Sequence, residues 1–425
     1  MEVRPGYKQT EVGLIPQAWE VRPLSRVADI RGGIAKNANS SISAPISVHY
    51  LRVANVQDGF LNLGEMSRIE LSRGDLLRYK VLPGDVLMTE GGDLDKLGRG
   101  AIWRGEFDPC VHQNHVFVVR CKADLIPEYL NIWTATSPVR RFFLVAGKQT
   151  TNLASISKSS LGELPVALPS LPEQRAIAAA LNDIDALLAG LDRLIVKKRD
   201  LKQAAMQQLL TGQTRLPGFQ GEWEVTRLGD AGKCLRGVSY RGDRDLSSHD
   251  TNHTRRLLRS NNVQAAAVVT AEVQYVNAER VSLQQSLMED DILICMANGS
   301  KALVGKAGLF RVRDGYQYTF GAFMGCFRTS IPLAHPVFVF YLFQTGRYRD
   351  YVNNLLAGSS INNLRPSSVE SLEFSMPDKS EQAAIAAVLS DMDAELTALE
   401  ARRAKTRALK QAMMQELLTG KTRLV

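Results

Sequence analysis

Apolar residues recur at alternating spacings of four and three along two long stretches of the chain that contain no proline. This spacing gathers the apolar side chains into one stripe along a helix, which is typical of a coiled-coil seam. At 1.5 Å of rise per residue, about 38 residues make a helix roughly 57 Å long. The pattern therefore predicts two long helices, each with a seam that needs a partner. The seam positions are Ile177, Leu181, Ile184, Leu188 and Leu191 in the first helix, and Ile385, Leu389, Met392, Leu396 and Leu399 in the second.

The two helical stretches are copies of each other. A shift of 208 residues brings 173–216 onto 381–424 without a gap, and 27 of 44 positions are identical. Both copies begin with Glu-Gln and end with Leu-Leu-Thr-Gly-x-Thr-Arg-Leu. The Glu-Gln pairs are Glu173-Gln174 and Glu381-Gln382. Such self-similarity predicts a repeated architecture.

The segments ahead of the two helices match more loosely. Leu51-Arg52 with Asn55-Val56-Gln57 corresponds to Leu258-Arg259 with Asn262-Val263-Gln264. The chain therefore has the order variable domain, constant helical region, variable domain, constant helical region. The predicted bounds are 1–168, 169–216, 217–376 and 377–425.

Two packings are open for the long helices. Each could lay its apolar face on its own variable domain, or the two could pair with each other in antiparallel fashion. We favour antiparallel pairing, because each helix has a full seam and the domain between them lets the chain return. Leu194-Ile195-Val196 in the first copy aligns with Arg402-Arg403-Ala404 in the second, so the pairing cannot be symmetric midway.

The variable domains have the pattern of mixed α/β domains. Short apolar stretches, broken by glycine-rich turns, predict strands. A short helix is expected late in each domain, at 127–136 and 336–345. The predicted fold is therefore α/β, with two mixed α/β domains separated by two long helices in an antiparallel coiled coil with pseudo-twofold symmetry. The predicted strands are 81–89, 115–121, 272–276, 291–296 and 323–328.

Composition narrows the class of protein. The 425 residues are 45% hydrophobic and 23% charged, which is too apolar for a disordered chain. No apolar stretch is long enough to span a membrane, and the first residues lack the pattern of a signal peptide. Five cysteines without C-x-x-C spacing indicate reduced thiols and predict a cytoplasmic protein. The net charge of +8 is spread thinly and favours a polyanionic partner only modestly.

Signatures of catalysis and metal binding are missing from the sequence. Gly147-Lys148-Gln149-Thr150 resembles the end of a phosphate-binding loop, but Phe142 stands where that loop needs its first glycine. His112-x-x-His115 lacks a third ligand at metal spacing. The carboxylate pairs Asp93/Asp95 and Asp290/Asp291 fit a solvated surface best. We therefore expect a binding protein without a catalytic or metal site of its own.

Polar and basic residues gather in corresponding loops of the two variable domains. Arg, Asn and Gln make bidentate contacts with base edges, while Lys, Ser and Thr mostly contact phosphates. A solvated surface is the alternative for each loop, and recurrence in both copies favours DNA binding. For 255–259, packing or pairing of one or two arginines is a further alternative. The candidate DNA-binding residues are Arg31, Lys36, Asn37, Asn39, Lys148, Gln149, Thr151 and Asn152 in the first domain, and Arg236, Tyr240, Arg241, Arg244, Ser359, Ser360, Asn362 and Asn363 in the second.

The chain resembles the DNA-specificity subunits of type I restriction–modification systems. The resemblance rests on the opening Tyr7-Lys8-Gln9-Thr10-Glu11-Val12-Gly13-Leu14-Ile15-Pro16 with Trp19, and on the Pro-x-x-x-Glu-Gln entry from Pro169 to Gln174. The Leu-Leu-Thr-Gly exit and the alternation of variable and constant segments complete it. The second copy departs slightly, because Ser380 stands where the first has Pro172.

This resemblance implies a function. Each variable domain would be a target-recognition domain for one half of an asymmetric, bipartite double-stranded DNA site. The paired helices would set the spacer and dock two methyltransferase subunits, and two translocating nuclease subunits would complete the enzyme. S-adenosylmethionine, ATP and magnesium would bind those partners rather than this chain, and no membrane is involved. Two alternatives are a stand-alone DNA-modifying enzyme and a coiled-coil scaffold without a DNA role.

Overall fold

A computed structural model describes residues 5–35, 44–92, 97–149, 154–357 and 362–424. The chain divides into two compact units, which we describe one at a time. Unit 1 comprises Met1–Asp192 and Ala401–Val425, and unit 2 comprises Arg193–Glu400. Each unit therefore holds one α/β domain and a part of each long helix. The division into four segments with the bounds given above stays a prediction.

The two long helices form where the seam pattern predicts them. They are α6 (Leu171–Leu209) and α11 (Lys379–Leu417). Asp378 caps the start of α11, since its Oδ1 accepts from the backbone N of Ser380 at 2.8 Å and of Glu381 at 3.0 Å. After the helix ends, Gly212 and Gly420 have φ values of +71° and +65°, the left-handed conformation that favours glycine.

Unit 1 begins with a hairpin and contains two principal sheets. Antiparallel pairing gives the order β4-β11-β7-β9 in one sheet, and β10-β5-β6 in the other includes a parallel β10–β5 pair. The strands are β1 (Tyr7–Thr10), β2 (Gly13–Pro16), β3 (Glu20–Pro23), β4 (Ala28–Arg31), β5 (Ile46–Leu51), β6 (Ser67–Leu71), β7 (Val86–Thr89), β8 (Gly91–Gly92), β9 (Gly100–Ile102), β10 (Cys110–His112), β11 (Val116–Cys121), β12 (Lys148–Gln149), β13 (Ala154–Ser155) and β14 (Pro165–Leu168). The shorter helices are α1 (Leu24–Val27), η1 (Val53–Asn55), α2 (Arg73–Tyr79), α3 (Pro127–Thr134), α4 (Ser137–Ala146) and α5 (Lys158–Gly162).

Unit 2 repeats this topology with local additions. Its sheets have the orders β16-β25-β22-β23-β20-β19 and β17-β21-β18-β24, again with one parallel pair, β18–β24, in the second. The strands are β15 (Glu224–Arg227), β16 (Gly232–Arg236), β17 (Leu246–Ser247), β18 (Thr254–Leu258), β19 (Val263–Gln264), β20 (Ala267–Val268), β21 (Gln274–Asn277), β22 (Ile292–Cys295), β23 (Ala307–Leu309), β24 (Tyr318–Phe320), β25 (Met324–Thr329) and β26 (Glu373–Met376). The shorter helices are α7 (Leu228–Ala231), η3 (Ser260–Asn262), η4 (Ala278–Arg280), η5 (Leu283–Gln285), η6 (Lys301–Leu303), α8 (Pro336–Leu342), α9 (Gly346–Ala357) and α10 (Pro366–Glu370).

The predicted strands and short helices of the variable domains are largely present. Helices α3 and α8 lie at the two predicted sites, and β11, β21, β22 and β25 differ from prediction by one or two residues at their ends. The expected strand 81–89 is wrong in its first half, because the backbone turns at Gly84 (φ +90°) and only β7 is extended. The mixed α/β class is confirmed.

Each α/β domain packs its core against the parts of the long helices in its own unit. In unit 1, Ile177 and Leu181 of α6 and Leu417 of α11 join the core around Trp19 and Tyr129. In unit 2, Leu209 of α6 and Ile385 and Leu389 of α11 join the core around Phe338 and Tyr348. The ends of the long helices therefore pack on the α/β domain of their own unit, which is the alternative that the sequence left open.

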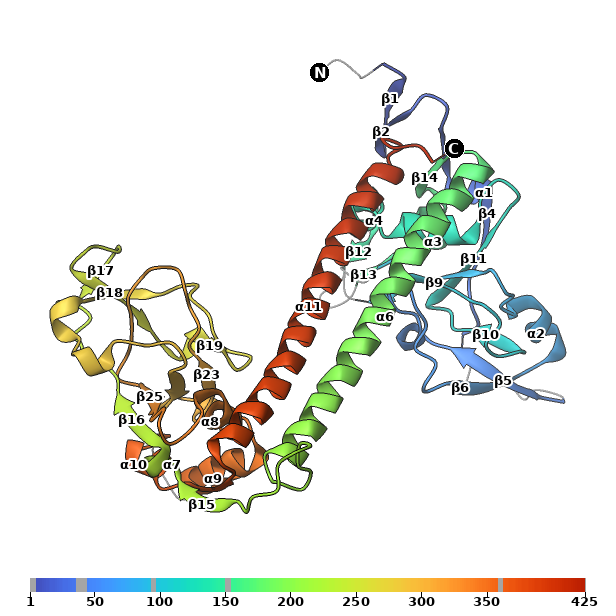
Figure 1. The fold of residues 1–425 in the computed structure, drawn as a ribbon. Coiled ribbons are helices and arrows are strands. Elements are labelled where there is room, and N and C mark those ends of the chain that lie inside the picture. Colours follow the sequence, from blue (N-terminus) through green and yellow to red (C-terminus); the bar gives the residue numbers. More distant parts are fainter. Residues whose placement is uncertain (1–4, 36–43, 93–96, 150–153, 358–361, 425) are drawn as a thin grey trace. The chain divides into compact units, whose positions relative to one another are not determined.

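The long helices also pair with each other, and they do so in antiparallel fashion within each unit. Figure 1 shows α6 and α11 running side by side. In unit 1, Asp185 of α6 binds Lys410 of α11 at 2.6 Å, and Asp192 binds Arg403 at 3.0 Å. Because the number falls along α11 as it rises along α6, the two helices run in opposite directions. The predicted antiparallel coiled coil is confirmed.

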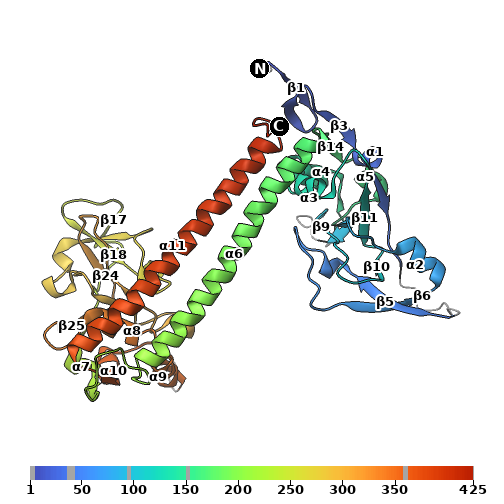
Figure 2. The same ribbon diagram turned by 45° about the vertical axis from the view of Figure 1, so that its right-hand side comes forward.

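The same pairing occurs in unit 2. Figure 2 shows the two helices side by side in a second view. In unit 2, Lys198 of α6 binds Glu395 of α11 at 2.7 Å, and Lys202 binds Asp393. A shift of 208 residues turns Asp185–Lys410 into Asp393–Lys202, so this ion pair occurs twice. Asp192–Arg403 has no such copy, because Ile195 aligns with Arg403, which agrees with the predicted break in symmetry.

Helices long and apolar enough to cross a bilayer are absent from the part of the chain that the structure describes.

Candidate nucleic-acid interface

The Glu-Gln and Thr-Arg motifs, which are far apart in sequence, meet at the ends of the paired helices. In unit 1 the carboxylate of Glu173, at the start of α6, is fully buried and binds the guanidinium of Arg423, just after α11. Trp19 Nε1 donates to the same carboxylate at 3.1 Å. Burial of a carboxylate is costly unless it is paired and hydrogen-bonded. The three side chains therefore form a fixed helix-end contact.

Unit 2 contains the reciprocal contact. Glu381, at the start of α11, is fully buried, and Arg215, just after α6, donates to it from Nε at 2.6 Å and from Nη2 at 2.5 Å. Arg215 also lies over the ring of Trp223, 5.6 Å from its centroid. Here the tryptophan Nε1 is buried without a partner among the described residues. The same motif thus joins the two helices in each unit.

The glutamines of the motif bind their own domain instead. Gln174 Nε2 donates to the carbonyl oxygens of Asp124 and Pro169, at 2.9 and 3.0 Å. Gln382 Oε1 accepts from the backbone N of His335 at 2.9 Å, and its Nε2 donates to the carbonyl oxygen of Pro377. Each helix start is therefore tied to the segment just before α3 or α8.

The predicted seam residues differ in burial along the helices. The first two positions of each seam are buried in the domain cores, and the later positions alternate between buried and half-buried. Buried are Ile177, Leu181, Leu191, Ile385, Leu389 and Leu396; half-buried are Ile184, Leu188, Met392 and Leu399.

Both α/β domains contain the same short turn, which we call the Arg-Asn turn: residues 52–55 in unit 1 and 259–262 in unit 2. In unit 1 the backbone N of Arg52 donates to Asn55 Oδ1 at 2.8 Å, and in unit 2 Arg259 donates to Asn262 Oδ1 at 2.9 Å. The asparagine Nδ2 then donates to two carbonyl oxygens of the following loop in both units. These buried asparagines explain the Leu-Arg…Asn-Val-Gln repeat of the sequence.

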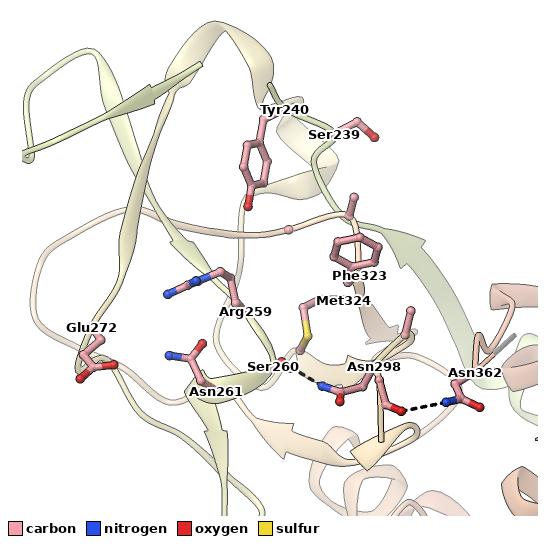
Figure 3. Close-up of a pocket in the computed structure, with 14 residues that line it drawn as sticks. Ser239, Tyr240, Arg259, Ser260, Asn261, Glu272, Asn298, Phe323, Met324 and Asn362 are labelled. Atoms are coloured by element: carbon pink, nitrogen blue, oxygen red, sulfur yellow. Dashed lines mark hydrogen bonds between the residues drawn. The ribbon is translucent and has the colours of Figure 1, made fainter. Parts of the chain in front are cut away.

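In unit 2 the Arg-Asn turn lines a cavity of about 1170 Å³. Figure 3 shows Arg259 extending into the space between Tyr240 and Asn261, away from Met324. The ring of Phe323, 72% exposed, lines the same cavity. The loops that follow β16, β18, β20, β22 and β24 supply these residues, together with the first residue of β25 and the segment after α9. The lining residues are Ser239, Tyr240, Arg259, Ser260, Asn261, Glu272, Ala297, Asn298, Gly299, Gly321, Ala322, Phe323, Met324 and Asn362.

Some polar groups of this cavity serve the fold. Asn362 Nδ2 donates to the carbonyl oxygen of Gly299 at 3.0 Å, and Asn298 Oδ1 accepts from the backbone N of Ser300 at 3.0 Å. Tyr240 Oη donates to Gln274 Oε1 at 3.2 Å. In contrast, Arg259 Nε is buried without an acceptor among the described residues. The cavity therefore combines rigid walls with a cationic group that has spare hydrogen-bonding capacity.

The family of the chain follows from comparison with known proteins. Residues 220–407 match the type I restriction modification DNA specificity domain. The putative type I restriction enzyme MjaX specificity subunit of Methanocaldococcus jannaschii is 24% identical, over 98% of this chain and 97% of that protein. The EcoKI specificity subunit of Escherichia coli is 28% identical over 42% of this chain and 38% of its own length. Residues 220–407 thus match a type I DNA specificity domain, and the chain is similar over nearly its full length to a type I specificity subunit.

The fold agrees with solved structures of this family. The type I restriction–modification S subunit from M. genitalium matches 98% of this chain and 98% of its own, with a TM-score of 0.59 and 13% identity. A chain from a structure on complex assembly and conformational transition of the type I system covers 96% of this chain and 99% of its own, with a TM-score of 0.56 and 15% identity. These structures confirm the fold, and the predicted assignment to a non-catalytic specificity subunit is supported by the matches to the DNA specificity domain and to the MjaX specificity subunit.

Part of the predicted DNA-binding set of unit 1 lies outside the described residues. Arg31 is exposed at the end of β4, and Lys148 is exposed in β12. Gln149 lies in β12, and its side chain is not described. The residues outside the described ranges are Lys36, Asn37, Asn39, Thr151 and Asn152.

Most of the predicted DNA-binding residues of unit 2 lie among the described residues. Tyr240 and Asn362, 122 positions apart in sequence, meet in the cavity. Arg236, Arg241 and Arg244 are exposed along β16 and the loop after it. Asn363 is exposed beside the cavity, next to Asn362. Ser359 and Ser360 lie outside the described residues.

The strand pairing also corrects the expected match between the late loops. Ala297 bridges Asn363 in unit 2, and Gly91 pairs with Ser155 in unit 1. Asn363 therefore corresponds to Ser155, and Asn362 to Ala154, rather than to the polar residues of 148–152. This register is the shift of 208 residues that also relates the two long helices, whereas the expected match followed the polar composition of the loops.

Sequence analysis missed a buried Asp–Arg pair that occurs in both units. Asp291 is buried, not solvated: Arg328 donates to both of its oxygens, at 2.9 and 2.7 Å. In unit 1, Asp85 and Arg120 form the same contact, at 2.7 Å for each bond. Asp290 instead pairs at the surface with Arg311, and Asp93 and Asp95 lie outside the described residues.

For the arginines of 255–259, the sequence left open a structural role or a DNA-binding role. Arg256 is held by Asp250 at 2.9 Å and Asp314 at 3.4 Å, and its guanidinium lies 3.1 Å from the ring centroid of Tyr316. It is therefore structural. Among the described residues, no carboxylate pairs with Arg259, which sets it apart from its neighbour.

The histidines do not form a metal site. Burial lowers the pKa of His112 to about 4, and its Nδ1 donates to the carbonyl oxygen of Val116 at 2.6 Å. His115 is exposed and pairs with Glu90 at 3.2 Å. Within the described ranges, no group of three His, Cys, Asp or Glu residues is arranged to hold a metal ion.

Proposed function

We propose that this specificity subunit reads an asymmetric, two-part site on double-stranded DNA, one part with each α/β domain. It directs two methyltransferase subunits, and with them two nuclease subunits, to that site. S-adenosylmethionine, ATP and magnesium bind to those partner subunits, as the family resemblance implies, and the chain itself contributes recognition.

The observation that carries this proposal is the contrast between framework and surface in the two domains. Both have the same sheets, the same buried Asp–Arg pair and the same Arg-Asn turn. The side chains around the turn differ: Asn261 corresponds to Ala54, and Phe323 to His115. Because base edges are distinguished by the side chains that reach them, two different surfaces on one framework favour two different half-sites.

The exposed faces of the paired helices support the docking of two like partners. Leu201 of α6 is 47% exposed in unit 2, and Leu409 of α11 is 54% exposed in unit 1. A shift of 208 residues relates these two leucines. Exposed leucines at related positions favour two equivalent apolar contacts, one in each unit.

Mapping of methylated adenines tests the proposal. DNA from cells that carry the chain with its methyltransferase should be methylated within one two-part, non-palindromic motif, and DNA from cells that lack the chain should not. Methylation that is independent of the chain, or that falls in a contiguous motif, would contradict the proposal.

The docking step has its own test. Leu201→Lys and Leu409→Lys together should abolish co-purification of the methyltransferase, because a charge in an apolar contact is costly. Gln207→Lys, at an exposed position of the same helix α6, serves as the control and should leave the complex intact. Retention of the methyltransferase by the double variant would disprove this docking surface.

A further inference from the structure

The most informative group outside the predicted set is the side chain of Arg259. Its backbone is fixed, because its N–H binds the fully buried Asn262, which in turn holds the carbonyl oxygens of Val269 and Ala271. The side chain leaves this rigid turn and enters the cavity of unit 2 (Figure 3). A cation is thus presented at a defined place.

The guanidinium of Arg259 lacks the partners that neighbouring arginines have. Arg256, Arg280 and Arg328 each form ion pairs with aspartates, at 2.9, 2.9 and 2.7 Å. The Nε of Arg259 is buried and has no acceptor among the described residues. Most buried hydrogen-bond donors in proteins have an acceptor. An unpaired donor beside a cavity therefore indicates that a ligand in the cavity supplies the acceptor.

Unit 1 shares two of these features, the fixed backbone of the arginine and its unpaired Nε. The backbone of Arg52 is held by Asn55 through an equivalent bond, and Arg52 Nε is also buried without an acceptor among the described residues. A second, independent domain therefore keeps an unpaired arginine at this position of the turn.

The residues next to these arginines have changed between the domains. Ser260 and Asn261 correspond to Val53 and Ala54, and Asn362 corresponds to Ala154. A side chain that reads a base should differ when the sequence read differs. A side chain that is the same in two different readers fits a group that all DNA shares, which is the phosphate.

We propose that Arg259, and Arg52 as its counterpart, each bind a phosphate group of the DNA backbone. These arginines contribute affinity and position the domain, whereas the changed residues around them contact base edges. This inference rests on the proposed function, because it requires that both domains bind DNA.

Packing of the arginine stem is the alternative role, and two substitutions separate it from phosphate binding. Arg259→Met keeps a long apolar stem and removes the charge, while Arg259→Lys keeps the charge. A packing role predicts that methionine serves as well as lysine. A phosphate contact predicts that lysine retains much of the binding and methionine does not.

The experiment measures DNA binding by the complex with the methyltransferase over a series of salt concentrations. It uses a duplex with the mapped target motif and a duplex of unrelated sequence. Arg259→Met should weaken binding to both duplexes by a similar factor, about tenfold. It should also reduce the slope of log K against log salt by about 0.9, because one phosphate contact is lost. The methylated motif should not change.

Arg313→Met is the matched control. Arg313 lies in the same unit, is exposed and is paired with Glu289, and its loss removes one positive charge away from the cavity. If it lowers the salt slope as much as Arg259→Met does, the long-range field of the protein explains the effect and the proposal is wrong.

Further outcomes distinguish failure of the phosphate assignment from failure of the proposed function. Equal binding by Arg259→Met and the unchanged protein, or weaker binding to the target duplex alone, would overturn the phosphate assignment while the proposed function stands. Absence of any target-dependent or salt-dependent binding by the unchanged complex would refute the proposed function itself. Thermal unfolding shows whether Arg259→Met is folded; if it is not, Arg52→Met and Arg259→Lys provide the same comparison.

Discussion

The α/β domains of units 1 and 2 share one framework, and they differ in the side chains at its open edge. Groups that hold the framework occur in both: the pairs Asp85–Arg120 and Asp291–Arg328 bind through two hydrogen bonds each. Groups at the open edge of the framework are replaced, as at Phe323 and His115. Buried polar groups tolerate little change, because each loss leaves a partner unpaired. The exposed edge has no such constraint and is free to acquire a new specificity.

The long helices also combine contacts that are repeated in both units with contacts that differ between them. Asp185–Lys410 in unit 1 and Asp393–Lys202 in unit 2 are copies, but the middle of the two helices is not. Ile195 is 1% exposed in α6, whereas its counterpart Arg403 in α11 is half-buried and binds Asp192. The two copies have thus diverged near the middle of the pair, where one carries an apolar contact and the other an ion pair.

The largest effect is expected from a charge in this middle region. Ile195→Asp places an unpaired carboxylate in an apolar contact and should destabilise unit 2 by about 5 kcal/mol or more. Val196→Asp, at the next position and 56% exposed, should cost less than about 1 kcal/mol. Urea unfolding followed by circular dichroism measures both. Similar midpoints for the two variants would show that Ile195 does not lie in the seam.

The buried ion pairs provide the second test. Asp291→Asn leaves Arg328 without its charge partner and should destabilise unit 2 by about 3–4 kcal/mol, and Asp85→Asn should do the same to unit 1. Asp290→Asn is the control, because its pair with Arg311 is more exposed and is worth less than about 1 kcal/mol. Thermal unfolding should show that Asp291→Asn and Asp85→Asn lower stability by similar amounts, and that Asp290→Asn lowers it less. A small effect at only one of Asp85 and Asp291 would mean that the two frameworks are not equivalent.

The third prediction concerns a difference between the two cores. His112 in unit 1 occupies the position of Phe320 in unit 2. Since burial lowers the pKa of folded His112 from 6.5 to about 4, the unfolded chain binds the proton first. The contribution of neutral His112 to stability is therefore full above pH 6.5 and is lost as the pH falls toward 4, by roughly 3 kcal/mol at most.

His112→Phe should remove this acid sensitivity and give unit 1 the behaviour of unit 2 at that position. The measurement is the unfolding midpoint between pH 7 and pH 4, compared with the unchanged chain. The absolute midpoint can fall, since the bond to Val116 is lost, so the slope with pH is the deciding quantity. An unchanged slope would refute the assignment of acid sensitivity to His112.

The smallest effect is expected at the open edge. Asn261→Ala gives unit 2 the residue that unit 1 has at Ala54. The Asn261 side chain is exposed, so stability should hardly change, and discrimination at one base pair of one half-site should fall by about 1 kcal/mol. Mapping of methylated sites shows whether that position becomes relaxed. Equal weakening at every position would make Asn261 a phosphate contact instead.

Much of this protein was determined by the sequence alone. The spacing of Leu181, Leu188 and their equivalents predicted the long helices and their seam, because a helix repeats a pattern over a few neighbouring residues. The shift of 208 residues predicted the repeated architecture, and the Glu-Gln and Leu-Leu-Thr-Gly motifs predicted the family. These signals are read along the chain and do not depend on how distant segments meet.

Tertiary structure alone decided which residues share a site. Glu173 and Arg423 are 250 positions apart, and only the antiparallel return of α11 brings them together. Asp290 and Asp291 look alike in sequence, yet Asp291 is buried and Asp290 is only half-buried. The same is true of Arg256 and Arg259, of which one is held by two aspartates and the other is unpaired beside a cavity. Burial and pairing depend on contacts between segments that are far apart in sequence, and the chain encodes those contacts collectively rather than at any one position.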